Sequence, residues 1–221
     1  KFFEQWQNLR QYANDRNIKI VGDISIYVCH NSSDVWGDPE IFKLDPEADA
    51  SYFMTDGLWQ NPGGGLPRRL TREGRVHDAT ADLYDHAFVL FAYAWHHRAT
   101  GNSRSRDLLY RTIDVIEDVL RHPTQPGFLN CAPMEGWRLQ NPHMHFAESC
   151  IAAFQSTGDN RFRSIGRELV EMFTTSLFDL ETGVLRESFT DDLRPIPGPD
   201  GDIVEPGHQF EWSWILNAMR P

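Results

Sequence analysis

Ala99-Thr100-Gly101-Asn102-Ser103-Arg104-Ser105-Arg106 and Ser156-Thr157-Gly158-Asp159-Asn160-Arg161-Phe162-Arg163 are two copies of one pattern, 57 residues apart. In each copy a Gly can end one helix, and an Asn, Asp or Ser can cap the next. Apolar residues on both sides recur at helical spacing, which predicts helices over residues 81–99, 105–121, 143–156, 160–177 and from 207 onward. The pattern therefore predicts a series of αα-hairpins from about residue 63.

Hairpins of this kind stack, because a single hairpin cannot bury its own apolar face. A third copy begins near His208, and the series can build either an open solenoid or a closed toroid. Two and a half units cannot close a ring. We therefore expect a mainly α fold that is an incomplete (α/α) barrel, with the chain cut at both ends.

The first part of the chain has a different pattern. Residues 1–16 have helical spacing, residues 18–28 form a β-branched apolar run typical of a buried strand, and an Asp- and Asn-rich loop follows over 31–38. The cluster of Pro and Gly over 61–67 then breaks the chain. We predict a helix–strand–loop α/β segment over residues 1–62, followed by the helical part over 63–221.

Composition excludes several classes of protein. The 221 residues carry a net charge of −11 with no basic patch, which argues against a nucleic-acid partner. No apolar run approaches the roughly 18 residues of a membrane span. Cys29, Cys131 and Cys150 lack the spacing of a disulfide framework or a zinc finger. We expect a cytoplasmic protein that binds neither membrane nor nucleic acid.

Two short motifs carry the chemistry. Pro142-His143-Met144-His145-Phe146-Ala147-Glu148 and Pro206-Gly207-His208-Gln209-Phe210-Glu211-Trp212 each place a His three residues before a Glu near a predicted helix start. Residues i and i+3 share a helix face, so each pair can transfer protons, with the carboxylate orienting the imidazole. The alternatives are core histidines or metal ligands. Further acidic ligands are not evident, so we expect no metal and no cofactor.

From about Gly63 onward, the chain resembles the N-acylglucosamine 2-epimerase family, which includes mannose isomerases and cellobiose 2-epimerases. The matching segments are Asp82-Leu83-Tyr84-Asp85-His86-Ala87-Phe88, Asn141-Pro142-His143-Met144-His145 with Glu148, Leu185-Arg186-Glu187-Ser188-Phe189, and Glu205-Pro206-Gly207-His208-Gln209-Phe210-Glu211-Trp212. The resemblance implies an (α/α) barrel of six hairpins. It also implies metal-free proton transfer at the carbon next to a sugar carbonyl.

The resemblance also assigns site residues. His145 matches a catalytic His of the family, His86 matches a site His of the isomerase branch, and a second catalytic His belongs to a later hairpin beyond Pro221. The predicted catalytic residues are His145 and His86, and the predicted substrate-binding or orienting residues are Arg138, Glu148, His208, Glu211 and Trp212.

Residues 1 to about 62 resemble the 4-α-glucanotransferases (amylomaltases). The segments that carry this likeness are Gln5-Trp6, Gly22-Asp23-Ile24-Ser25-Ile26-Tyr27-Val28, Ser33-Asp34-Val35-Trp36, Pro39-Glu40-Ile41-Phe42-Lys43-Leu44-Asp45 and Leu58-Trp59-Gln60-Asn61-Pro62. One helix–strand–loop unit cannot make that family's β/α barrel or supply its two carboxylates.

Three functions follow as hypotheses. The first is a sugar isomerase or 2-epimerase that takes a small sugar and has an incomplete helical domain. The second is an inactive sugar-binding remnant. The third is an α-glucan-acting protein derived from a 4-α-glucanotransferase. The sequence leaves open which sugar is used and the oligomeric state.

Overall fold

The structure is a computed structural model that describes residues 7–8, 11–12, 15, 59, 61, 64–71 and 75–220. The chain divides into two compact units, Lys1–Ala50 and Ser51–Pro221. In the first unit the described residues at 7–8 and 11–12 are helical, within the helix predicted over 1–16. The predicted strand over 18–28 and the loop over 31–38 lie outside the described residues.

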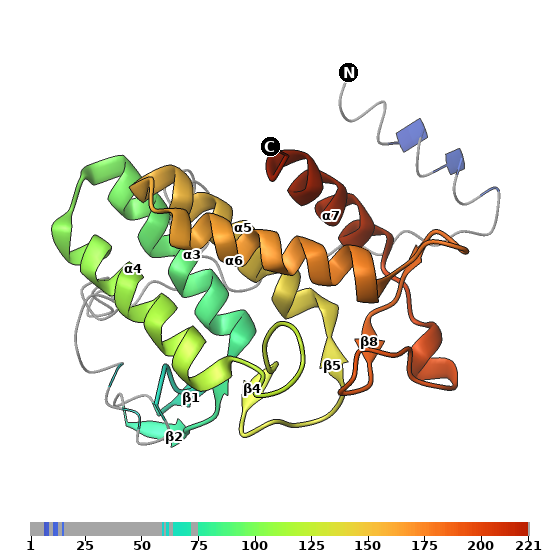
Figure 1. Cartoon of the computed structure of the whole chain (residues 1–221), viewed down its shortest axis with the longest axis horizontal. Helices are drawn as coiled ribbons and strands as arrows, with labels where there is room; N and C mark the ends of the chain where they lie inside the picture. The colour runs from blue at the N-terminus through green and yellow to red at the C-terminus, as the bar shows by residue number, and fades with distance from the viewer. Residues whose placement is uncertain are drawn as a thin grey trace. The chain divides into compact units, whose positions relative to one another are not determined.

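The described part of the second unit is mainly helical, which confirms the predicted fold class (Figure 1). Its elements are β1 (Arg69–Leu70), β2 (Val76–Asp78), β3 (Ala81–Asp82), α3 (Leu83–Thr100), α4 (Ser103–Val115), the π-helical η4 (Ile116–Leu120), β4 (Cys131–Ala132), β5 (Arg138–Leu139), α5 (Gln140–Thr157), α6 (Asn160–Met172), the π-helical η5 (Phe173–Leu177), β6 (Phe178–Asp179), β7 (Val184–Leu185), β8 (Ser188–Phe189), the 3₁₀ segment η6 (Pro199–Asp202) and α7 (Pro206–Ala218).

The repeat read from the sequence recurs element by element. The three pairs of elements start at Leu83 and Gln140 (α3 and α5), Ser103 and Asn160 (α4 and α6), and Ile116 and Phe173 (η4 and η5). Each pair is offset by 57 residues, and each helix has the length of its counterpart. The turn and the π-helical segment that follows the second helix are therefore both part of the repeated unit.

The predicted caps account for the turns between the helices. Gly101 and Gly158 end α3 and α5 in the left-handed region, at φ of 68° and 71°. The side chains of Asn102 and Asp159 then accept hydrogen bonds of 3.1 and 2.9 Å from backbone N–H groups in the first turns of α4 and α6. These contacts satisfy helix-end groups that would otherwise lack partners.

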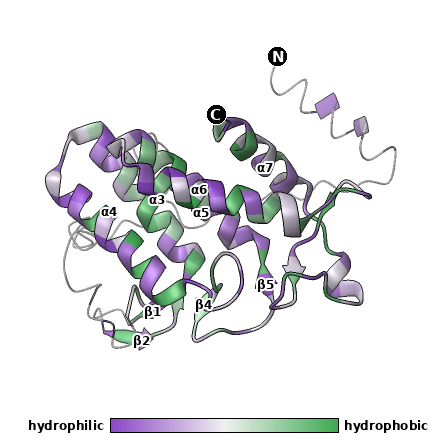
Figure 2. Cartoon of the chain, in the orientation of Figure 1, coloured by the Kyte–Doolittle hydropathy of each residue, from purple (hydrophilic) through white to green (hydrophobic). Residues whose placement is uncertain are grey.

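Packing between the hairpins is apolar inside and ionic outside. Helix α3 packs most extensively against α5, while α4 covers α3, α6 covers α5, and α7 packs on α5. The amphipathic α4 and α6 alternate hydrophobic and hydrophilic residues (Figure 2). The Arg161 guanidinium of α6 binds Asp114 of α4 at 2.7 Å and Glu117 of η4 at 2.5 Å. The hairpins therefore join as the repeat predicts.

Four two-stranded antiparallel ribbons, β1–β2, β3–β4, β5–β8 and β6–β7, complete the described part. Strands β3 and β5 lead directly into α3 and α5. Ribbons β3–β4 and β5–β8 therefore fix the N-terminal ends of these two helices, where the conspicuous histidines lie.

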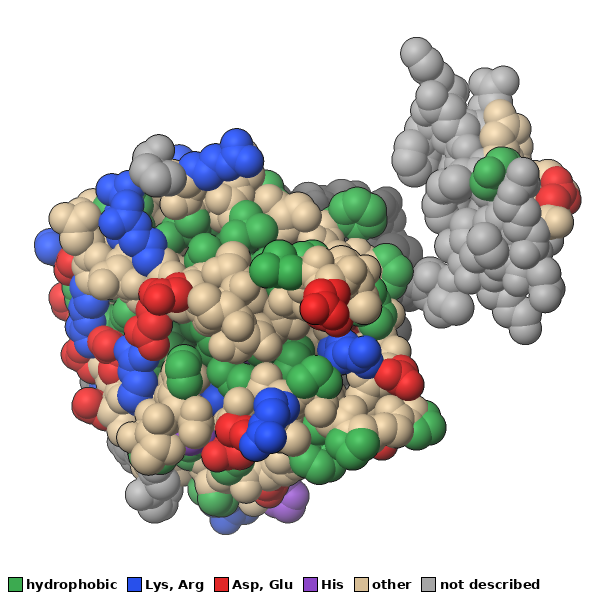
Figure 3. All heavy atoms as spheres, turned by 45° about the vertical axis from the view of Figure 1, so that its right-hand side comes forward, with side chains coloured by type: hydrophobic (Ala, Val, Ile, Leu, Met, Phe, Trp, Pro, Cys, Tyr) green, Lys and Arg blue, Asp and Glu red, His purple; other side chains and the backbone are tan. Residues whose placement is uncertain are grey.

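The surface carries mixed charge. On the face drawn in Figure 3, acidic and basic side chains are interspersed among apolar ones. Over the described residues, every helix is too short or too polar to cross a bilayer.

Candidate functional site

His145 and Glu148 form a hydrogen-bonded pair on α5. His145 Nδ1 lies 2.7 Å from Glu148 Oε2, and the two side chains are 16% and 25% exposed. Aromatic side chains of α3 hold the imidazole, with Tyr84 edge-on at 5.2 Å and Phe88 at 4.9 Å between ring centroids. These contacts fix the orientation of the imidazole on the side that faces α3, while part of the ring stays exposed to solvent.

Glu211 of α7 completes this group, which we call the His145 site: His145, Glu148, Glu211, Tyr84 and Phe88. One ligand atom each of His145, Glu148 and Glu211 lies within 4.8 Å of the other two. Burial raises the pKa of the Tyr84 phenol, and the nearby carboxylates, including Glu211 and Glu148, raise it further. The site thus combines negative charge with a protonated phenol.

The cavity beside His145 is small. It measures about 20 Å³ and is lined by Ala87, Phe88, Phe91, His145 and Glu148. This volume suits a water molecule, so a sugar ring would have to bind at the open side of the imidazole.

His208 of α7 belongs to a neighbouring polar group. Its Nδ1 lies 2.9 Å from Glu187 Oε2, and its Nε2 lies 2.9 Å from the amide nitrogen of Asn141. Gln140 donates to Glu187 at 2.8 Å and accepts from the Trp212 indole at 2.7 Å. An imidazole that donates from Nδ1 and accepts at Nε2 satisfies these contacts.

The two His-x-x-Glu motifs meet across α5 and α7. His145 lies one turn beyond Asn141 on α5, and Glu211 lies one turn beyond His208 on α7. Since Asn141 contacts His208, and His145 lies close to Glu211, the two helices share one polar strip. The structure therefore brings four predicted site residues together.

His86 does not join them. Its ring is fully buried, its Nδ1 donates to the Asp82 carbonyl at 2.6 Å, and its Nε2 accepts from the Leu66 N–H at 2.9 Å. Burial lowers its pKa. With both nitrogens bonded to the backbone, His86 holds a loop against α3, a role different from the catalytic one predicted for it.

His143, 57 residues after His86, repeats this arrangement. Its Nδ1 donates to the Leu139 carbonyl at 2.8 Å, and its Nε2 accepts from the Phe128 N–H at 3.1 Å. Burial, followed by the charge of Arg138, lowers the pKa of His143 to about 4. We call each of these histidines, with its two backbone partners, a histidine latch.

A glycine with positive φ, Gly65 or Gly127, comes directly before the residue whose N–H donates to each latch histidine. Substitution of Gly65 tests how much the His86 latch contributes to stability. At Gly65 (φ 72°) an added Cβ would lie 2.7 Å from His86 Nε2, whereas at Gly183 (φ 70°) it would meet no atom within 4 Å. Gly183→Ala should cost about 1 kcal/mol of unfolding free energy through backbone strain. Gly65→Ala should lower the unfolding free energy by about 2 kcal/mol more than Gly183→Ala does, because the added methyl group would also clash with the imidazole of His86. Urea unfolding measures both values, and equal losses would contradict the latch.

Arg138 and Trp212 were predicted to bind or orient substrate, and both lie in the interior. Arg138 is 1% exposed and donates to the backbone carbonyls of Pro126, Phe128 and Asp191 at 2.7–3.2 Å. Burial lowers its pKa to about 10. Arg138 therefore joins the segment that contains Pro126 and Phe128 to the loop at Asp191, and it does not face a ligand.

Trp212 has no exposed surface. It stacks on Phe173 with ring centroids 4.2 Å apart, and its indole N–H is bonded to Gln140. Trp212 therefore packs α7 against α5, and its ring offers no surface on which a sugar could stack.

Sequence reasoning did not single out the partners of these residues. Tyr84 and Phe88 contact His145, and Glu187 and Gln140 contact His208. Three of the four occur in segments that carry the family resemblance, so a signal was present, but it did not distinguish contact residues from their neighbours.

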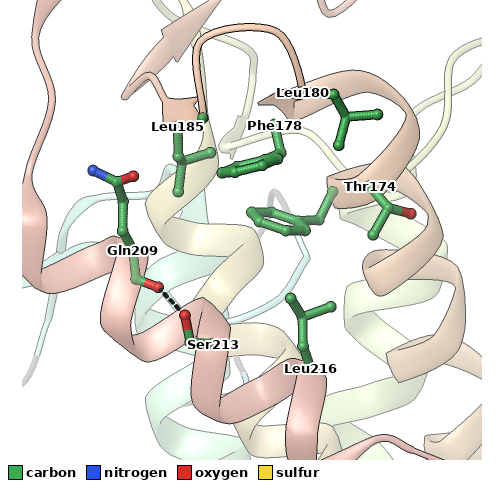
Figure 4. A pocket seen from close by; sticks show the side chains of 9 residues that line it. Thr174, Phe178, Leu180, Leu185, Gln209, Ser213 and Leu216 are labelled. Carbon is green, nitrogen blue, oxygen red and sulfur yellow. Dashed lines mark hydrogen bonds between the residues drawn. The ribbon is translucent and has the colours of Figure 1, made fainter.

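A larger cavity lies away from these histidines. It measures about 380 Å³ and lies between η5, the β6–β7 ribbon and α7 (Figure 4). Its lining includes Phe178, Leu185 and Leu216, with Gln209 and Ser213 supplying polar groups. It contains none of the predicted site residues, and its walls offer no acid–base pair.

Comparison with known families divides the chain in two. The sequence model of the N-acylglucosamine 2-epimerase family matches residues 48–220, and that of the 4-alpha-glucanotransferase family matches residues 1–67. The predicted boundary at residues 62/63 falls where these matches overlap and stays a prediction.

Curated relatives follow the same division. Mannose-6-phosphate isomerase of Rhizobium meliloti (strain 1021) is 34% identical over 174 residues, which are 76% of this chain and 44% of that protein. The 4-alpha-glucanotransferase of Clostridium butyricum is 46% identical over 72 residues, which are 28% of this chain and 15% of that protein. The chain thus spans less than half the length of these relatives.

Solved structures agree on the fold. Cellobiose 2-epimerase from Spirochaeta thermophila DSM 6192 superposes with a TM-score of 0.65 at 23% identity, over 76% of this chain and 44% of that one. D-mannose isomerase superposes with a TM-score of 0.63 at 25% identity, over 74% and 43%. The repeated hairpins and the match over residues 48–220 lead to one conclusion: the chain belongs to the N-acylglucosamine 2-epimerase family.

Proposed function

We propose that this protein is a sugar isomerase or 2-epimerase in which His145 moves a proton at the carbon next to the sugar carbonyl. The observation that carries the proposal is the 2.7 Å contact between His145 Nδ1 and Glu148, beside Glu211 and the phenol of Tyr84. The proposal applies to the whole protein, because this chain covers only 44% of the length of the family members compared above.

The geometry of the pair favours His145 as a base. When Nδ1–H donates to Glu148, the lone pair of the neutral imidazole is on Nε2. No described residue forms a hydrogen bond with Nε2. Nε2 removes the proton from the carbon next to the carbonyl, and the electrons of the C–H bond form the C=C bond of an enediolate. Glu148 stabilises the imidazolium that results.

The fate of that proton decides the reaction. If the imidazolium returns it to the former carbonyl carbon, and the hydroxyl proton passes from the oxygen on C2 to the oxygen on C1, an aldose becomes a ketose. Epimerisation requires delivery to the opposite face of the original carbon by a second acid. Both ring nitrogens of His208 have described partners, so His208 is a poor candidate for this second acid. Isomerisation of the mannose–fructose type needs only the single base His145.

The other side chains suit a sugar. The protonated Tyr84 phenol can donate a hydrogen bond to a sugar oxygen, Glu211 can accept one from a hydroxyl, and Phe88 offers an apolar surface. These groups would orient the substrate over His145 Nε2.

Incubation with mannose in heavy water tests the proposal. We expect deuterium to enter at C2 and fructose to form, both without added metal. Failure to exchange C2–H with mannose, glucose or cellobiose would overturn it. Disproportionation of maltotriose would support the glucan-acting alternative that the first 67 residues suggest.

A further inference from the structure

We propose that His145, Glu148 and Glu211 also bind a divalent transition-metal ion of the zinc class, and that this ion blocks His145. Metal binding by these residues is independent of the proposed function. The blocking effect rests on it.

The ligand set has the right chemistry and approximate positions. One imidazole nitrogen and two carboxylate oxygens, all within 4.8 Å of one another, come from α5 and α7. Bonds of about 2.0–2.2 Å in a tetrahedral site place ligand atoms about 3.3–3.6 Å apart. The hydrogen-bonded pair of His145 Nδ1 and Glu148 Oε2, 2.7 Å apart, would have to open by less than an ångström. Glu211 would have to move toward the pair by about an ångström, and flexible carboxylate side chains allow both changes.

The electrostatics favour a cation at this position. Glu211 Oε2 is buried and has no hydrogen-bond partner among the described residues. An unpaired buried carboxylate oxygen is costly, and a second carboxylate, that of Glu148, lies close by. A divalent ion would neutralise both carboxylates.

A second group of possible ligands makes the contrast clear. Glu187, Glu205 and His208 also have ligand atoms within 4.8 Å of one another. There, however, Gln140 and Asn141 already bond to Glu187 and His208 at 2.8 and 2.9 Å. A metal at the second group would have to break these two amide hydrogen bonds as well as the one between His208 and Glu187. At the first group it replaces only the hydrogen bond between His145 and Glu148, so the first group is the better site.

Binding at Nδ1 would explain the block. A metal on Nδ1 displaces the proton from that atom, and neutral imidazole then carries its proton on Nε2. The lone pair that would accept the sugar proton is no longer available. The metal therefore inhibits through the tautomer of His145 as well as by occupying the site.

The test measures binding directly on the full 221-residue chain. Titration with Zn²⁺ by calorimetry, and with Co²⁺ by visible absorption, should show one ion bound. Glu211→Gln and His145→Gln should each weaken affinity roughly 100-fold. Glu205→Gln is the matched control, since it removes a carboxylate from the second group, and it should leave affinity unchanged.

The outcomes separate the two proposals. Unchanged affinity in folded Glu211→Gln, or loss of binding only in Glu205→Gln, would overturn the metal site. If the chain exchanges C2–H, Zn²⁺ should suppress exchange and EDTA should restore it; full exchange at saturating Zn²⁺ would overturn the blocking effect. If the whole protein has no exchange activity, the proposed function fails, and the Co²⁺ titration still decides the metal site.

Discussion

Replacing His145 with Gln is expected to lower deuterium exchange at C2 of mannose by about 10²- to 10⁴-fold, the range typical of a lost general base. Gln keeps a polar side chain of similar reach but cannot accept and release a proton near neutral pH. Since His145 is partly exposed and bonds to Glu148 alone among hydrogen-bonding groups of the described chain, the variant should fold. NMR of the sugar measures the exchange rate.

Two further variants make this result specific. Glu148→Gln should lower exchange less, by about 10- to 100-fold, because the imidazolium loses its charged partner. His97→Gln, in the last turn of α3, is the matched control and should leave the rate unchanged. A His145→Gln protein that folds and still exchanges at the parent rate would exclude His145 as the base.

The second large effect concerns acid stability and arises from the latch at His143. The imidazole has a pKa of about 4 when folded and about 6.5 when unfolded. Above pH 6.5 both states are neutral, so the group does not change stability. Between pH 6.5 and 4 the unfolded chain binds a proton that the folded chain excludes, so the free energy of unfolding falls by on the order of 3 kcal/mol.

Denaturant titrations at pH 7.5, 6.5, 5.5 and 4.5 check this slope. His86 has its pKa lowered by burial too, so it adds a loss in the same direction. In His143→Gln the protein should be less stable at pH 7.5, but its stability should depend less on pH between 6.5 and 5. An unchanged slope in that variant would show that other groups cause the acid sensitivity.

The hairpin architecture could be predicted because its signals are local. Gly101 and Gly158 adopt the left-handed conformation that ends a helix, and the residues after them cap the next one. The start of α5 was predicted less well: residue 143 was expected, whereas the helix begins at Gln140. The β5–β8 ribbon that leads into it depends on contacts between residues about 50 positions apart, which spacing alone cannot reveal.

The site was predictable in part for a similar reason. Both His-x-x-Glu pairs are local, and the i, i+3 rule placed His145 with Glu148. Burial is not local. His86, Arg138 and Trp212 have the chemistry of ligand-binding groups, but tertiary packing gives the His86 ring, the terminal nitrogens of Arg138 and the Trp212 indole backbone or amide partners inside the protein. Nothing in their spacing distinguishes such a residue from one that faces a substrate.

The side chain of Gln140 gives the molecule a built-in optical probe. Its amide bonds at one end to the Trp212 indole and at the other to Glu187, the partner of His208. A ligand that displaces His208 or Glu187 would alter the hydrogen bond between Gln140 and the Trp212 indole. Indole fluorescence emission shifts with the polarity of its surroundings, so the change could be detected. Fluorescence difference spectra against Trp212→Phe would therefore record occupancy of the polar strip without any turnover.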